Sequence, residues 1–139
     1  APRITGAGEI ADTAELAPTA AALALLASGP TRLTGIGHLR GHETDRLAAL
    51  TAEAARLGIT VDEDETSLGF PGTDASGPLS PAALETYHDH RMATFAAVVG
   101  LRVPGTGIVD VATTAKTMPD FPALWTALVA PGDAAEEAR

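Results

Sequence analysis

The chain has 139 residues, enough for one domain with a hydrophobic core, and its 45% hydrophobic and 19% charged residues are typical of a globular protein. A net charge of −9 argues against nucleic-acid binding through a basic surface, and the absence of cysteine excludes disulfides, thiolate zinc sites and a cysteine nucleophile. No apolar run approaches the roughly 18–20 residues of a membrane span, so we expect a soluble, cytoplasmic protein.

The first half of the chain alternates extended and helical segments. Leu16, Leu23, Leu26 and Ala27 recur at the spacing of one helix face, and Pro18 fits this helix only within its first turn. Gly58 marks the end of a second helix. The expected segments are an extended stretch over 1–12, a helix over 15–27, a strand over 31–36, a polar loop over 37–46, a helix over 47–57 and antiparallel strands over 59–62 and 66–70.

The second half repeats this order. Phe121, Leu124, Trp125 and Leu128 give its last helix an apolar stripe. In both halves a helix is followed by a Gly/Pro turn, a strand, a polar loop and another helix, and this alternation favours an α/β fold with some parallel strand pairing. The expected segments are a loop over 71–81, a helix over 90–101, a strand over 108–111, a polar loop over 112–120, a helix from 121 and a flexible tail over 131–139.

Cationic side chains lie where the polar loops meet the helices. Arg46, Arg91 and Lys116 each fall at or just before a helix start, although the chain as a whole is acidic. Helix N-termini present free N–H groups and the positive end of the helix dipole, so added cations create a focus for anions. The pattern predicts a site for a phosphorylated or carboxylated small molecule.

Simpler interpretations exist for the acidic residues beside these cations. Glu43 and Asp45 could complement the dipole of the helix that follows them, and Asp89 could cap the next helix. Each such signal is weak by itself. The substrate-site interpretation gains support because the charged groups recur at corresponding ends of a repeated unit.

The four histidines could also be read as a metal cluster. They are His38, His42, His88 and His90. Three of them lie in loops, so they are not paired as metal ligands on one helix face. We therefore expect no metal site.

Three motifs, in this order, resemble the EPSP synthase family of enolpyruvyl transferases. They are His42-Glu43-Thr44-Asp45-Arg46-Leu47, Asp89-His90-Arg91-Met92-Ala93 and Thr114-Ala115-Lys116-Thr117-Met118-Pro119-Asp120. The resemblance extends from about Glu15 to Trp125, which is most of the chain.

The resemblance implies a fold of βαβαββ repeats, of which this chain holds part of one domain. Residues 1–130 would be the C-terminal part of that domain, with units at about 1–70 and 80–130. In the family the main contacts to shikimate 3-phosphate come from the N-terminal domain, which would be the partner of this part. The chain alone is therefore expected to be catalytically silent, with at best weak anion binding.

The reaction that the resemblance implies transfers enolpyruvyl from phosphoenolpyruvate to the 5-hydroxyl of shikimate 3-phosphate, in the shikimate pathway of aromatic amino-acid biosynthesis, without metal or organic cofactor. Arg46, Arg91 and Lys116 resemble the cations that hold phosphoenolpyruvate. Glu43 matches the acid that protonates its methylene carbon, and Glu15 matches the carboxylate that meets the attacking hydroxyl.

Three histidines complete the implied site. His90 matches a residue beside the reaction intermediate, His42 stands where many family members have Lys, and His38 where many have Asn. Glu15 replaces a more usual Asp. Two other functions stay open at this point, a relative of the UDP-N-acetylglucosamine enolpyruvyl transferases and a non-catalytic domain that keeps only the anion pocket.

Overall fold

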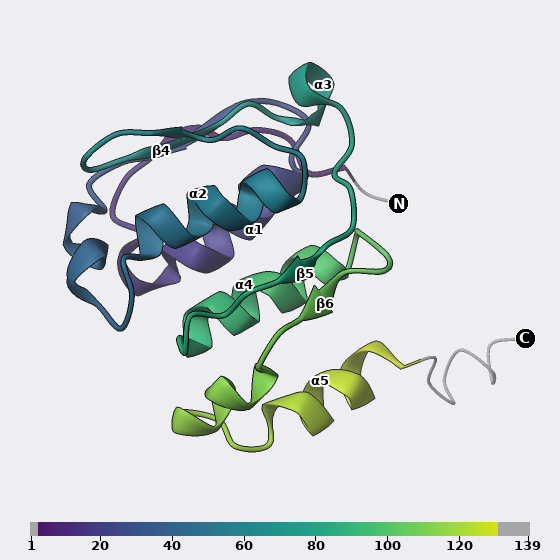
Figure 1. Ribbon diagram of the computed structural model, residues 1–139. Helices are drawn as coiled ribbons and strands as arrows, with labels where there is room; N and C mark the ends of the chain where they lie inside the picture. Colours follow the sequence, from purple (N-terminus) through teal and green to yellow (C-terminus); the bar gives the residue numbers. More distant parts are fainter. Residues whose placement is uncertain (1–2, 131–139) are drawn as a thin grey trace, which may run out of the picture.

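The computed structural model describes residues 3–130, and its first half is a complete βαβαββ unit (Figure 1). Its elements are β1 (Gly8–Ile10), α1 (Ala17–Leu26), β2 (Thr31–Leu33), α2 (Arg46–Arg56), β3 (Asp62–Glu63) and β4 (Leu68–Phe70). The sheet order is β1-β2-β4-β3, with β1 and β2 parallel and β4 antiparallel to both of its neighbours. Both helices lie on one side of this sheet.

The second half continues with a strand–helix–strand–helix order. Its elements are β5 (Ala83–Leu84), α4 (His90–Gly100), β6 (Gly107–Ile108) and α5 (Phe121–Val129). Short helical turns also occur at η1 (Ala14–Leu16), η2 (Gly37–Gly41), α3 (Thr73–Ser76) and η3 (Val111–Lys116). β5 and β6 pair in parallel. The predicted repeat is confirmed, because α1-β2-η2-α2 and α4-β6-η3-α5 follow the same order.

The core lies where α1 packs against α4 beneath the first sheet. Ala17, Ala21 and Ala22 of α1 and Ala93 and Ala96 of α4 are all at most 1% exposed. Such small side chains let two helices approach closely. The larger buried residues fill the space around them, and each fully buried Leu or Phe contributes about 1.5–3 kcal/mol. They include Leu33, Leu50, Leu68, Phe70, Leu84 and Phe95.

The predicted apolar face of the first helix is only partly confirmed, because Ala27 is 1% exposed and Leu26 packs against the core, but its other two members are exposed. Leu16 and Leu23 are 61% and 44% exposed, and Leu25 at 2% is buried together with the alanines. The α-helix also begins only at Ala17, because Ala14 adopts a left-handed φ of 49° and the residues between form a 3-10 turn. Pro18 does lie in the first turn, as predicted.

Left-handed residues also shorten the predicted strands. The strand expected over 31–36 ends at Leu33, shortly before Gly35 with a φ of 68°. The strand expected over 108–111 ends at Ile108, because Asp110 has a φ of 57°. The expected antiparallel pair is present, although only 62–63 and 68–69 are paired with each other. β5 was not predicted; at two residues it is too short for periodicity to reveal.

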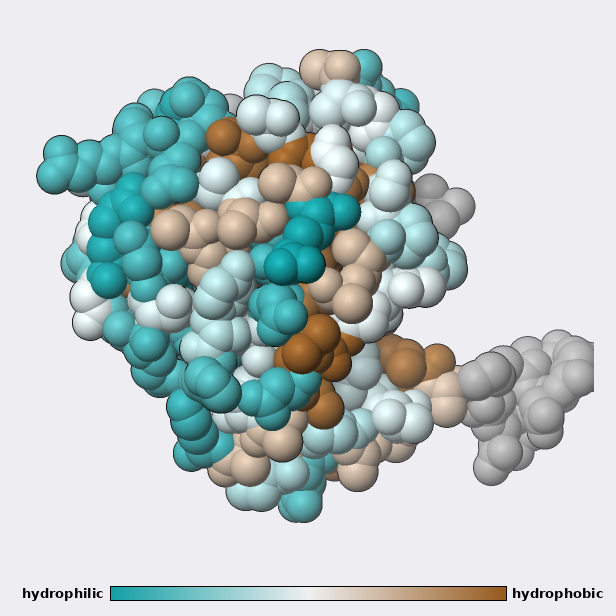
Figure 2. All heavy atoms as spheres, in the orientation of Figure 1, coloured by the Kyte–Doolittle hydropathy of each residue, from teal (hydrophilic) through white to brown (hydrophobic). Residues whose placement is uncertain are grey.

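The last helix carries its predicted apolar stripe but buries none of it. Leu124 and Leu128 are 57% and 75% exposed. Figure 2 shows hydrophobic atoms at the surface between the β5–β6 region and α5, on a face that is otherwise mostly hydrophilic or neutral. The tail predicted over 131–139 lies outside the described residues. Within residues 3–130 every helix is too short or too polar to cross a membrane.

Candidate functional site

The N-terminal ends of α2 and α4 meet in space, and an aspartate caps each of them. Asp45 accepts a hydrogen bond from the N–H of Ala48 at 3.0 Å, and Asp89 accepts one from the N–H of Arg91 at 2.9 Å. Asp and Asn are preferred at this position because they satisfy a free N–H of the first turn. The cap interpretation is therefore confirmed for Asp45 and Asp89.

The buried centre of the site is an ion pair between Arg46 and Asp89. Nε of Arg46 donates to Oδ2 of Asp89 at 2.8 Å, and Nη2 donates to Oδ1 at 3.2 Å. The two side chains are 2% and 0% exposed. A bidentate pair of this geometry offsets much of the cost of taking both charges out of water. Arg46 is thus deeper than its position beside a polar loop suggested.

Glu15 joins this pair from the first helical turn of the chain. Nη1 of Arg46 donates to its Oε2 at 2.7 Å, and Nε2 of His42 lies 3.3 Å from its Oε1. Partial burial raises the pKa of Glu15, but the hydrogen bond from Arg46 and the charges of His42, Arg46 and Arg91 lower the pKa below its ordinary value overall. Glu15 is therefore a carboxylate at neutral pH.

Burial lowers the pKa of Arg46, whereas its hydrogen bonds to Asp89 and Glu15 and their charges raise it overall. The guanidinium consequently stays positive in spite of its depth. Three of its N–H groups are engaged by the two carboxylates. Because a guanidinium carries five, two are left to donate to a further acceptor.

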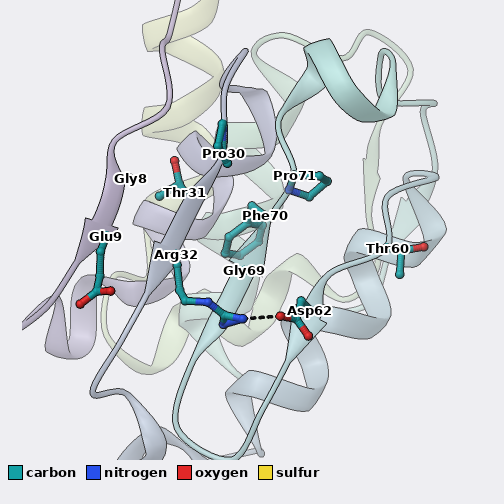
Figure 3. Close-up of a pocket in the computed structure, with 10 residues that line it drawn as sticks. All are labelled: Gly8, Glu9, Pro30, Thr31, Arg32, Thr60, Asp62, Gly69, Phe70 and Pro71. Carbon is teal, nitrogen blue, oxygen red and sulfur yellow. Dashed lines mark hydrogen bonds and ion pairs between the residues drawn. The ribbon is translucent and has the colours of Figure 1, made fainter.

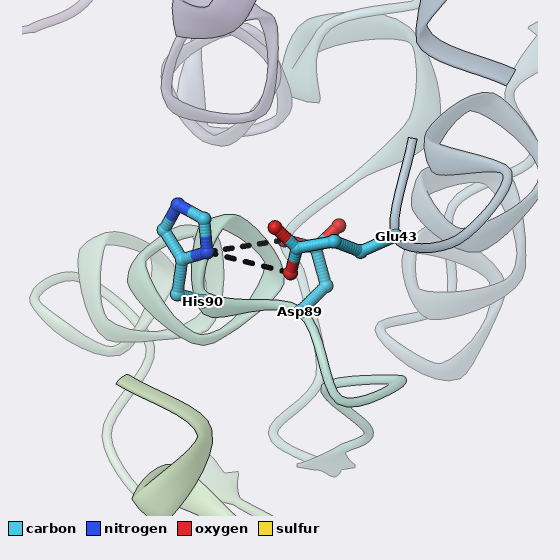
Figure 4. A group of neighbouring side chains, drawn as sticks. All are labelled: Glu43, Asp89 and His90. Atoms are coloured by element: carbon cyan, nitrogen blue, oxygen red, sulfur yellow. Dashed lines mark ion pairs between the residues drawn. The ribbon is translucent and has the colours of Figure 1, made fainter. Parts of the chain in front are cut away.

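Glu43 and His90 face each other at the mouth of this cluster (Figure 4). Nδ1 of His90 lies 3.5 Å from Oε2 of Glu43 and 3.9 Å from Oδ1 of Asp89. This Nδ1 is buried and has no hydrogen-bond partner among residues 3–130. Nζ of Lys116 lies 3.9 Å from the same Glu43 oxygen. Glu43 is thus placed between an imidazole and a cation rather than at a helix cap.

The three residues of Figure 4 are also the group that could hold a metal ion, because one ligand atom from each of Glu43, Asp89 and His90 lies within 4.8 Å of the others. Both oxygens of Asp89 already accept hydrogen bonds from Arg46. A metal would have to compete with that cation and with Lys116 beside Glu43. The donor set therefore suits an anionic organic molecule, held by the cations, better than a metal.

Lys116 and Arg91 complete the set of cations. Nζ of Lys116 donates to the carbonyl oxygen of His88 at 2.6 Å, and its side chain is 53% exposed. Arg91 and His90 line a cavity of about 300 Å³ between α4 and the start of α5. Both cations are therefore accessible, in contrast to Arg46.

His38 lies at the edge of the group. Its ring centroid is 6.2 Å from that of His42, and it makes no ion pair with the other predicted residues in the described part of the chain. Arg40, another loop cation, is engaged by Asp45 and Glu63 at 2.9 Å and 2.8 Å. The structure thus separates Arg40 from the cations of the site.

A second cavity, of about 460 Å³, lies on the first sheet (Figure 3). Arg32 and Asp62 form an ion pair across it. None of the site residues predicted from the sequence lines this cavity. It therefore contributes nothing to the cluster at the helix starts.

Sequence reasoning missed one partner of the site and one buried carboxylate outside it. Asp89 was taken only as a cap, although it also holds Arg46, and its place in the same motif as His90 and Arg91 was the available signal. Glu53 was not singled out at all. It lies on the buried face of α2, where a carboxylate needs hydrogen-bond donors, and that was the signal in its case.

The sequence model of the EPSP synthase family (3-phosphoshikimate 1-carboxyvinyltransferase) matches residues 4–125. A 3-phosphoshikimate 1-carboxyvinyltransferase from Kocuria rhizophila is 54% identical over 121 residues, covering 87% of this chain and 26% of the relative. One from Mycobacterium ulcerans is 50% identical over 123 residues, covering 87% and 28%. The chain thus spans about a quarter of the length of these curated relatives.

Solved structures give the same picture. EPSP synthase from Acinetobacter baumannii has a TM-score of 0.69 and is 31% identical, covering 77% of this chain and 25% of that one. The enolpyruvyl transferase NikO from Streptomyces tendae has a TM-score of 0.65 at 23% identity, covering 89% and 28%, and shows the shared fold. With the motifs around Arg46, Arg91 and Lys116 and a family match over residues 4–125, this chain belongs to the EPSP synthase family.

Proposed function

We propose that this chain is the C-terminal part of a 3-phosphoshikimate 1-carboxyvinyltransferase, which transfers enolpyruvyl from phosphoenolpyruvate to the 5-hydroxyl of shikimate 3-phosphate and releases phosphate. The observation that carries the proposal is the grouping of Arg46, Arg91 and Lys116 around Glu15 and Glu43 at the adjoining starts of α2 and α4. Phosphoenolpyruvate carries both a phosphate and a carboxylate, so it calls for several cations.

The three cations would divide the binding of phosphoenolpyruvate among them. Arg91 and Lys116 are accessible and can close on the ligand as side chains. Arg46 is fixed by Asp89 and offers its two remaining N–H groups from a set position. Fixed donors cost little reorganisation when charge develops on the ligand.

The two glutamates would supply the acid–base chemistry. Glu43 protonates the methylene carbon of phosphoenolpyruvate, with His90 and Lys116 beside its carboxyl group. Glu15, whose pKa is lowered by its cationic neighbours, accepts the hydrogen bond of the attacking hydroxyl and orients it. His42, close to Glu15, and His38 behind it would contact the substrates at this side.

A chimaeric enzyme tests the proposal. The part of this chain that aligns with the Kocuria rhizophila relative over 121 residues replaces the corresponding part of that enzyme, and phosphate release is measured with phosphoenolpyruvate and shikimate 3-phosphate. The chimaera should turn over, and Lys116→Ala should lower kcat/KM by about 10²-fold or more. Arg32→Gln, a cation on the sheet cavity, is the control and should keep activity within about threefold. A folded chimaera without phosphate release would overturn the proposal.

The wider setting follows from the same proposal. Residues 1–130 would be part of an enolpyruvyl transferase domain, with units at about 1–70 and 80–130, completed by the N-terminal domain of the same enzyme. The enzyme would need no metal or organic cofactor and would work in the cytoplasm, in aromatic amino-acid biosynthesis.

A further inference from the structure

Glu53 is a buried carboxylate that the proposed chemistry does not use. Its side chain is 0% exposed, yet it lies on α2, away from the start of that helix. Oε1 accepts a hydrogen bond from the N–H of Glu85 at 2.6 Å, and Oε2 accepts one from the hydroxyl of Tyr87 at 2.7 Å. Nε of Arg56 donates to Oε2 at 3.2 Å. Both carboxyl oxygens of Glu53 therefore have hydrogen-bond donors, and we call this group of contacts the clasp.

This clasp holds the segment that leads into the site. Tyr87 and His88 both have a φ of 56°, a left-handed conformation that side chains other than glycine rarely adopt. Two such residues in succession persist only where the surroundings hold them. The hydroxyl of Tyr87 on Glu53 is one such restraint, and the hydroxyl of Thr86, which donates to the carbonyl oxygen of Val109 at 2.9 Å, is another.

The strained segment in turn places two cations of the site. The carbonyl oxygen of His88 accepts the hydrogen bond of Lys116. The next residue, Asp89, holds Arg46. A change in the backbone at Tyr87 and His88 therefore displaces the acceptors of Arg46 and Lys116 together, although neither cation touches Glu53.

We propose that Glu53 and Tyr87 are positioning residues that keep the 87–88 backbone left-handed and thereby set Arg46 and Lys116 for an anionic substrate. The assignment of that substrate as phosphoenolpyruvate rests on the function proposed above. The positioning role itself rests only on the contacts of the described residues. The two are therefore tested by separate measurements.

The first measurement uses the 139-residue chain without substrate. Tyr87→Phe removes one hydroxyl and leaves the ring, and Thr51→Val removes a hydroxyl that donates within α2 to the carbonyl oxygen of Leu47. Hydrogen exchange is measured at the Nε–H of Arg46 and at the backbone amide of Leu50. We use the ratio of the two exchange rates, because global unfolding exposes both groups and its effect cancels in the ratio. Tyr87→Phe should raise this ratio about tenfold and Thr51→Val less than about twofold. An unchanged ratio in Tyr87→Phe would overturn the positioning role.

The clasp can be observed directly because Tyr87 is the only tyrosine. Burial, together with the hydrogen bond and the charge of Glu53, raises the pKa of Tyr87 to about 12. Absorbance titration of the tyrosinate should show this raised value and a lower one in Glu53→Gln. A wild-type midpoint near the ordinary value of 10.0 would show that the clasp does not form.

The second measurement places the same two variants in the chimaeric enzyme. Displaced cations weaken both the binding of phosphoenolpyruvate and the stabilisation of charge that develops on it, so Tyr87→Phe should lower kcat/KM about tenfold and raise the KM for phosphoenolpyruvate. A loss of folded protein would instead lower the apparent kcat alone, and that result would contradict the positioning role. If the wild-type chimaera is inactive, the proposed function fails, and the exchange ratio still decides the role of the clasp.

Discussion

The buried pair of Arg46 and Asp89 makes the sharpest prediction for stability. Asp89→Ala removes a fully buried carboxylate that both caps α4 and holds Arg46. Leaving one member of a buried pair without its partner typically costs about 3–5 kcal/mol, and a lost cap adds about 1 kcal/mol. Because Glu15 keeps one hydrogen bond from Arg46, we expect a total of about 3–5 kcal/mol.

Urea unfolding followed by circular dichroism measures this loss. With a slope of roughly 1–2 kcal/mol per molar urea, a loss of about 3 kcal/mol lowers the midpoint by roughly 2 M. Asp45→Ala is the matched control, because Asp45 caps α2 in the same way but its side chain is 40% exposed. The control should lose only about 1 kcal/mol, since an exposed ion pair adds little to the cap.

Two further variants separate the loss of the cap from the cost of an unpaired buried charge. Asp89→Asn keeps an oxygen for the cap and should lie between the wild type and Asp89→Ala in stability. Replacing both partners, as Arg46→Met with Asp89→Leu, should cost less than Asp89→Ala alone, because no charge is then left buried. Equal losses of unfolding free energy in Asp89→Ala and Asp45→Ala would refute the argument that burial makes the Arg46–Asp89 pair important for stability.

Three more outcomes are expected. Gly72→Ala should lower the unfolding free energy by more than about 2 kcal/mol in the same urea assay, because the added Cβ would lie 2.5 Å from the backbone of Gly29 and the residue has a φ of 86°. Gly77→Ala is its control and should cost only about 1 kcal/mol, because Gly77 has a similar φ of 82° but no atom within 4 Å of the added Cβ. Because the pKa of Tyr87 is raised, its neutral hydroxyl stabilises the fold fully below pH 10, and this stabilisation is lost as the pH rises through about 12. The unfolding free energy of the wild type should therefore fall more over that interval than that of Tyr87→Phe. The 139-residue chain alone should release no phosphate from phosphoenolpyruvate and shikimate 3-phosphate, and measured turnover by it would contradict the division of the site between two domains.

The order of the elements could be predicted from the sequence because it depends on local signals. Gly58 and the Gly/Pro turns mark the helix ends, and spacing reveals the helices themselves. The buried face of α1 could not be predicted in this way, because leucine outranks alanine in hydrophobicity. What decides that face is the close approach of α4, which admits Ala21 and excludes Leu23.

The candidate site was likewise predicted only where it depends on local sequence. The positions of Arg46, Arg91 and Lys116 at helix starts followed from sequence order. That Arg46 is buried did not, because its partner Asp89 lies 43 residues further along the chain. Left-handed backbone at Tyr87 was equally invisible, since no glycine marks it.

Charge balance explains how the cations can stay together without a ligand. Arg46, Arg91 and Lys116 share the site with Glu15, Glu43 and Asp89, so as many acidic as basic side chains meet there. Asp89 and Glu15 therefore hold Arg46 in place during folding rather than at binding, so the ligand does not bear the cost of ordering this guanidinium. The same balance limits the attraction that this part alone exerts on an anion. Under the function proposed above, the N-terminal domain would supply the further cation for phosphoenolpyruvate that the resemblance to the family implies.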